Sequence, residues 1–182
     1  MQKFIVIPNL HLPSQNFIEW AQNFSNSGLD VVVFENPVLG KEWQEIVIEI
    51  DTFFDQHVEK GKETYYLTEG WGLSPALEAA EKNKVSGIFS IHPIISIPKK
   101  SKIHPLYENS TRPEYLVERS TAALHFFMPE QAFENDYKKT AKLLKQLSKP
   151  NISVKSYEES SLYSQNCLDE IESYILYKLG RR

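Results

Sequence analysis

The chain has 182 residues, of which 41% are apolar and 24% are charged, so it can bury a core of its own and does not have the composition of a disordered tail or a fibre. Its 24 acidic and 20 basic side chains give a formal net charge of -4, which provides no overall attraction to nucleic acid or to an anionic membrane. We therefore expect one globular domain, and nucleic-acid-binding and membrane-binding proteins are disfavoured classes.

The apolar segment near the N-terminus, Phe4 to Pro8, is too short for the core of a signal peptide or for a membrane span. We therefore expect a soluble, cytoplasmic protein. Cys167 is the single cysteine, which excludes an intramolecular disulfide and a cysteine-clustered metal site. The five histidines show no short ligand spacing, so we expect neither a metal nor a cofactor. The sequence leaves the oligomeric state open.

Apolar runs and amphipathic segments alternate along the first half of the chain. The continuous run Phe4–Ile7 is typical of a strand buried on both faces of a parallel sheet. An amphipathic helix follows, which Ser14 can cap and Gly28 can end. The pattern then predicts strands over 29–34, 64–68 and 85–91, with helices over 43–61 and 75–82 between them.

The alternation is interrupted once and then resumes. Residues 93–120 hold four prolines and little periodicity, which predicts a long loop or a small lid-like excursion. After it we expect strands over 122–128 and 152–157, each followed by a helix, over 136–148 and 168–179. This order predicts right-handed crossovers and about six mainly parallel strands with helices on both faces of the sheet.

The turn after the third expected strand reads Gly70-Trp71-Gly72-Leu73-Ser74 and leads into an alanine-rich helix. This strand, turn and helix resemble the nucleophile elbow of the α/β-hydrolase superfamily, in which Gly-x-Ser-x-Gly lies on a strained turn. Over nearly the whole chain, the element order and loop spacing are similar to the compact single-domain serine hydrolases of the retinoblastoma-binding-protein type. The resemblance implies a minimal α/β-hydrolase-like three-layer sandwich formed by residues 1–182, with the 93–120 excursion over the carboxyl edge of the sheet.

The nucleophile position of this family motif does not carry a nucleophile here. It falls on Gly72 or, if the motif is started at Thr68, on Gly70. A hydroxyl attacks an acyl carbon only when a nearby base takes its proton and a third group orients that base. Neither glycine can supply the attacking group.

The other two catalytic positions also depart from the family. The acid position falls on Gln131 or, with a shift, on Glu130, and the histidine position falls on Leu162. No histidine occurs after His125. The sequence therefore predicts a catalytically degenerate homologue that acts by binding a protein partner or a small acidic or acyl ligand.

Backbone groups of the family's oxyanion hole do not depend on the lost side chains. The N–H groups of Leu73 and of Asn9 or Leu10 are candidates, next to the N-terminus of a helix. Alternatively, the glycines only permit the turn, Ser74 caps the helix and Pro75 is its first residue. The candidate ligand-binding residues lie in two loops: Asn9, Leu10, His11, Gly70, Trp71, Gly72, Leu73 and Ser74.

Two further interpretations remain open. An esterase or thioesterase can work through relocated residues, with Ser74 as nucleophile, His92 as base and Glu130 or Glu69 as the orienting acid. The chain can also be an engineered version whose elbow serine was replaced.

The excursion carries a basic group within an acidic chain. Lys99, Lys100 and Lys102 can contact an acidic protein partner, although such a run is often only a solvated loop. They are the candidate partner-binding residues.

Overall fold

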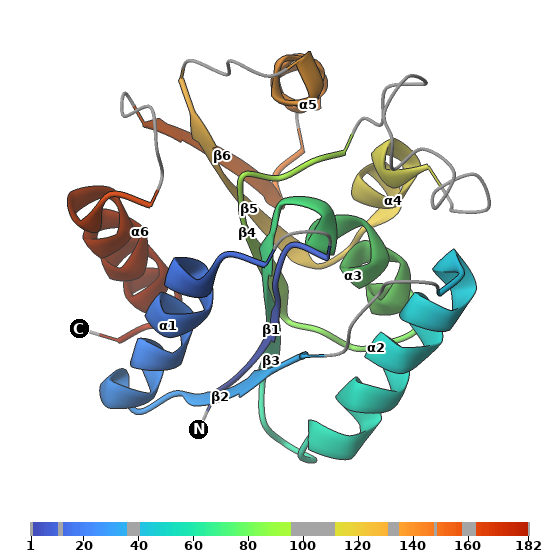
Figure 1. Ribbon diagram of the computed structural model, residues 1–182, viewed down its shortest axis with the longest axis vertical. Helices are drawn as coiled ribbons and strands as arrows, with labels where there is room; N and C mark the ends of the chain where they lie inside the picture. The colour runs from blue at the N-terminus through green and yellow to red at the C-terminus, as the bar shows by residue number, and fades with distance from the viewer. Residues whose placement is uncertain are drawn as a thin grey trace.

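Figure 1 shows the fold of the chain in a computed structural model, which describes residues 2–10, 13–35, 41–95, 112–130, 135–147, 149–157 and 163–181. The strands are β1 (Lys3–Ile7), β2 (Asp30–Val33), β3 (Thr64–Glu69), β4 (Gly87–Ile91), β5 (Ala123–Pro129) and β6 (Ile152–Tyr157). The helices are α1 (Gln15–Asn23), α2 (Trp43–His57), α3 (Leu73–Ala80), α4 (Pro113–Arg119), α5 (Asn135–Gln146) and α6 (Gln165–Lys178). Short 3₁₀ turns cover Phe24–Ser27 and Gly70–Gly72.

The six strands form one sheet in the order β2-β1-β3-β4-β5-β6, and every neighbouring pair is parallel. This confirms the expected architecture of about six mainly parallel strands with helices on both faces. Parallel strands bring their carboxyl ends to the same edge of the sheet, where α/β proteins bind their ligands. The loops that leave β1, β3, β4 and β6 therefore decide what this edge can do.

Two hydrophobic cores cover the two faces of the sheet. Alternate residues of β1 enter opposite cores, with Ile5 on one face and Phe4 on the other, as the two-residue repeat of a strand requires. Helices α2, α3, α4 and α5 supply side chains to the first core, and α1 and α6 supply them to the second. Figure 1 shows α1 and α6 together on one side of the sheet and α2, α3 and α4 on the other.

Two residues expected at the ends of the first helical segment, Ser14 and Gly28, lie at those ends in the structure. The Ser14 side chain accepts a hydrogen bond from the backbone N–H of Phe17 and caps α1. Gly28 has φ 73 and ends the 3₁₀ turn that follows α1. Only glycine adopts this left-handed conformation without strain.

Two expectations about helices are wrong. Helix α3 begins at Leu73, so Ser74 is not its N-cap and Pro75 is not its first residue. The reason is that the 3₁₀ turn Gly70–Gly72 runs directly into the helix, and no extended capping residue separates them. The 93–120 segment also contains α4, which the sequence pattern did not predict; residues 96–111 lie outside the described part.

Within the described residues, no helix is long and apolar enough to span a membrane.

Candidate functional site

The candidate site lies at the carboxyl edge of the sheet, around the turn that follows β3. Asn9 lies in the loop after β1. Glu69 is the last residue of β3, Gly70 begins the 3₁₀ turn that follows it, and His92 directly follows β4. Tyr163 lies in the segment between β6 and α6. Hydrogen bonds and ring contacts join these residues into one cluster, which we call the elbow cluster.

The backbone of the turn distinguishes its two glycines. Gly70 has φ 51, a left-handed backbone conformation that residues with a side chain rarely adopt. A Cβ atom built on Gly72 would lie 2.5 Å from the carbonyl oxygens of Ile7 and Pro8, which is shorter than any real contact. The strained position of the turn is thus Gly70, and the position of close backbone approach is Gly72. This pattern favours the motif register that starts at Thr68 and puts Gly70 at the nucleophile position.

Glu69 is the centre of the elbow cluster. This residue is 3% exposed. One carboxylate oxygen accepts hydrogen bonds from the backbone N–H of Asn9 at 3.1 Å and of Ser14 at 3.4 Å, and the other accepts one from the Tyr163 hydroxyl. Burial raises the pKa of the Glu69 carboxyl above its usual range, while the three donors act in the opposite direction.

His92 closes another side of the cluster. It has φ 50 although it is not a glycine, a conformation that is uncommon and is concentrated at functional or strained positions. Its ring meets the ring of Tyr163 edge-on, with 5.2 Å between the centroids. Burial lowers the pKa of the His92 imidazole to about 4, so the ring is neutral at pH 7.

The backbone donors expected to bind a small acid are already engaged. The N–H of Asn9 donates to Glu69, and the N–H of Leu73 donates to the carbonyl of Gly70. Leu10 and Trp71 are buried, at 9% and 8% exposure. His11 lies outside the described residues. Two of the three N–H groups named from the sequence, those of Asn9 and Leu73, are therefore not available to a ligand from solution.

Ser74 and Glu130, two residues of the relocated-site hypothesis, lie in different surroundings. Ser74 is fully buried, and its hydroxyl donates to the carbonyl oxygen of Ile94 at 3.3 Å. A hydroxyl has a single proton, so this one is not given to a base. Glu130 follows β5 and is exposed. The other family positions and the expected partner-binding lysines lie outside the described residues: Gln131, Leu162, Lys99, Lys100 and Lys102.

The sequence pattern gave no role to Tyr163 and indicated Glu69 only as an orienting acid. The available signal was a glutamate directly after an apolar strand, since charged residues are almost never fully buried without partners. The sequence did not indicate which groups would bind the Glu69 carboxylate, because Asn9 and Tyr163 are 60 and 94 residues away from it.

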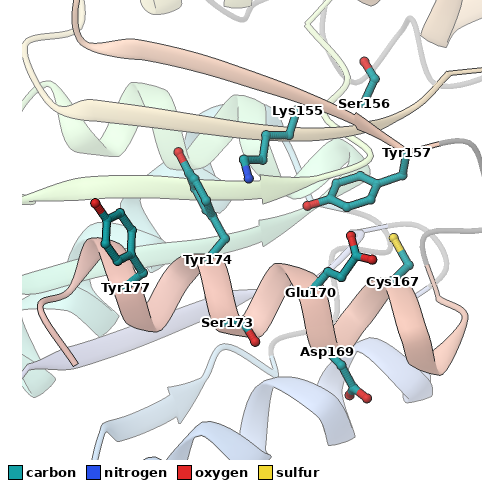
Figure 2. Close-up of a pocket in the computed structure, with 9 residues that line it drawn as sticks. All are labelled: Lys155, Ser156, Tyr157, Cys167, Asp169, Glu170, Ser173, Tyr174 and Tyr177. Carbon is teal, nitrogen blue, oxygen red and sulfur yellow. The ribbon is translucent and has the colours of Figure 1, made fainter. Parts of the chain in front are cut away.

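A second concave surface lies outside this edge, between β6 and α6 (Figure 2). Three tyrosines line this groove, and the Lys155 ammonium lies 4.0 Å from the ring centroid of Tyr174. The Lys178 ammonium lies 5.5 Å from the same centroid. The lining residues are Lys155, Ser156, Tyr157, Cys167, Asp169, Glu170, Ser173, Tyr174 and Tyr177.

Hydrogen bonds fix the floor of this groove beside Tyr174. The Tyr174 hydroxyl lies 3.2 Å from the Ser153 hydroxyl and 3.3 Å from Nδ1 of His125. Ser153 in turn lies 2.6 Å from the same nitrogen of His125, whose ring stacks on Phe89. His125 therefore has a hydrogen-bonded structural role inside β5.

Within the described ranges, no three side chains of His, Cys, Asp or Glu gather in the way that metal ligands would.

Comparisons with solved structures identify the fold of the chain. No family model and no curated protein matches the chain. A monoacylglycerol lipase of Paleococcus ferrophilus superposes with a TM-score of 0.71 at 12% identity, over 95% of this chain and 93% of the lipase. Est1E from Butyrivibrio proteoclasticus gives 0.73 at 10% identity, over 99% and 89%. A Nitrososphaera gargenis structure described in work on carboxylesterases gives 0.74 at 9% identity, over 98% and 91%. The expected α/β-hydrolase fold is confirmed.

Proposed function

We propose that this chain, which has the α/β-hydrolase fold, is a catalytically degenerate homologue that acts by binding and does not cleave acyl bonds. The observation that carries the proposal is the turn after β3, where the strained position is Gly70. A glycine has no atom that can attack an acyl carbon.

The surroundings of Gly70 support the same proposal. The adjacent Glu69 carboxylate accepts from the Asn9 N–H, and the nearby Ser74 gives its proton to a carbonyl oxygen. Nucleophilic catalysis needs a hydroxyl or thiol within hydrogen-bond reach of a base. Gly70 has no such group, and the Ser74 hydroxyl donates its proton to the carbonyl oxygen of Ile94.

Labelling and turnover test the absence of acyl cleavage. We expect no reaction of the full chain with a fluorophosphonate probe and no turnover of p-nitrophenyl acetate or butyrate, under conditions in which an active esterase of the same fold reacts. Fluorophosphonate labelling of the folded chain would contradict the proposal.

The alternative function is that of an esterase or thioesterase. It is suggested by the monoacylglycerol lipase and by the structure from the work on carboxylesterases, which share this fold. The esterase alternative predicts that the fluorophosphonate probe labels the natural chain and does not label the Ser74→Ala variant. Because Ser74 is buried and bonded to Ile94, we expect Ser74→Ala to alter stability and to leave the blank labelling result unchanged.

Of the two ligand classes, we favour a protein partner over a small acidic or acyl ligand. The N–H groups of Asn9 and Leu73, two of the backbone donors that a small acid would use, are engaged within the chain. The groove between β6 and α6 is open, and among the described residues Lys155 and Lys178 form no ion pair. These lysines and the Lys99, Lys100 and Lys102 group are candidate contacts for acidic side chains of a partner.

Charge reversal separates the two candidate surfaces. A partner captured by the immobilised chain should be retained less by Lys155→Glu/Lys178→Glu or by Lys99→Glu/Lys100→Glu/Lys102→Glu. The control is Lys142→Glu/Lys145→Glu, which reverses two exposed lysines of α5. Equal retention by all three variants would remove both surfaces from the proposal.

A further inference from the structure

We propose that the elbow cluster is an anion-binding site whose resident ligand is the carboxylate of Glu69, and that acetate takes the place of this carboxylate when the side chain is removed. The inference does not depend on the proposed function, because it concerns binding alone.

Three donors from separate parts of the chain converge on this one carboxylate. The Asn9 N–H lies in the loop after β1 at 3.1 Å, and the Ser14 N–H lies at the start of α1 at 3.4 Å. The third donor is the hydroxyl of Tyr163, beyond β6. A set of backbone N–H groups completed by one hydroxyl is a common way for proteins to hold an anion.

Neutral donors hold the charge of Glu69. Among the described residues, no lysine, arginine or histidine forms an ion pair with this carboxylate. Glu69 is 3% exposed, and its carboxylate lies beside the N-terminus of α1, whose partial positive charge favours an anion. The donors, rather than a counter-ion, therefore make the burial of this group possible.

Because Glu69 occupies the three donors, they are not open to ligands from solution. A carboxylate arriving from solution finds the three donors engaged, so the natural chain excludes small acids from the elbow cluster. The atoms that Glu69→Ala removes are those of an acetate ion. The variant would leave the same donors around a space of that size, and buried donors without acceptors are costly.

Titration of Glu69→Ala with sodium acetate tests the inference. We expect the backbone amide signals of Asn9 and Ser14 to shift in a saturable manner in ¹⁵N NMR spectra. We also expect the melting temperature of the variant to rise with acetate concentration and not with sodium chloride at equal ionic strength. The unsubstituted chain should show neither effect.

Two further variants define the donors and guard against loss of folding. In Glu69→Ala/Tyr163→Phe the acetate affinity should fall about tenfold, because one donor to a charged group is lost. Glu69→Gln retains an acceptor oxygen for Asn9 and Ser14 and should fold without acetate. If Glu69→Ala is unfolded in chloride, the yield of refolded protein in acetate replaces the melting temperature as the readout.

Several results would overturn the inference. They are an acetate response equal to the chloride response in Glu69→Ala, saturable amide shifts in the unsubstituted chain, or an acetate affinity that is unchanged by Tyr163→Phe.

Discussion

Gly72 lies where the start of α3 crosses the end of β1, and the absence of one carbon atom there sets the distance between the two elements. Its φ is −65, an ordinary value, so conformational freedom is not why glycine is needed. The need is steric, because the carbonyl oxygens of Ile7 and Pro8 occupy the space of a side chain. Gly70, two residues earlier, shows the opposite case, in which backbone conformation is the constraint.

Gly72→Ala tests the steric argument. The new Cβ would lie 2.5 Å from two backbone oxygens, which cannot move without shifting β1, so we expect a loss of about 3 kcal/mol in the free energy of unfolding. The measurement is urea denaturation of the variant and of the unsubstituted chain.

The control is Gly61→Ala. Gly61 has φ +84, and no atom lies within 4 Å of the place that a Cβ atom would take, so alanine there meets conformational strain alone, which costs about 1 to 2 kcal/mol. Equal losses in the two variants would show that contact with β1 is not what requires Gly72.

Among the elements, α4 shows how tertiary packing can stabilise a helix whose own sequence is too short to form one alone. It has seven residues, fewer than an isolated helix needs to be stable in water. Pro113 begins it, and Leu116 and Val117 are buried in the core that α2 and α3 share. The apolar contact of these two side chains, rather than helix propensity, therefore holds α4 in place.

Leu116→Ala and Arg119→Ala compare the two kinds of contact that α4 makes. Leu116 is 1% exposed, so truncation should cost about 3 kcal/mol of stability. Arg119 pairs with Glu81 at 2.6 Å, but both side chains are well exposed, so its loss should cost less than about 1 kcal/mol. Thermal or urea unfolding measures both, and a larger effect for Arg119→Ala would contradict this account of α4.

At the scale of the whole molecule, the stability of the fold depends on pH through two half-buried histidines and the buried Glu69, which lie on one face and at the edge of the sheet. Burial lowers the pKa of His125 and of His92 to about 4, compared with about 6.5 in an unfolded chain. Between these two values the unfolded chain binds more protons than the folded chain. The histidine contribution is therefore fully present above pH 6.5 and is lost as the pH falls towards 4. Glu69 acts in the opposite sense, because its pKa is raised.

His125→Phe isolates one of these contributions. Phenylalanine keeps a ring against Phe89 and removes the titrating group. We expect the free energy of unfolding of the variant to depend less steeply on pH between 6.5 and 4, while the contribution of Glu69 is common to both proteins. Tyr174→Phe is the control, since it removes a hydroxyl from the same network and keeps the imidazole. An identical slope for His125→Phe and the unsubstituted chain would contradict the prediction.

The sequence by itself determined the strands, their alternation with helices and hence the class of sheet, because apolar runs and helical stripes are local patterns that burial makes obligatory. It also showed that no histidine follows His125, which bears on catalysis whatever the alignment. Tertiary structure decided the strained residue of the turn, the first residue of α3 and the existence of α4. It also decided which donors surround Glu69, since Asn9 and Tyr163 meet it from 60 and 94 residues away. Such choices rest on backbone approach and on hydrogen bonds across the sheet edge, and neither leaves a periodic trace in the chain.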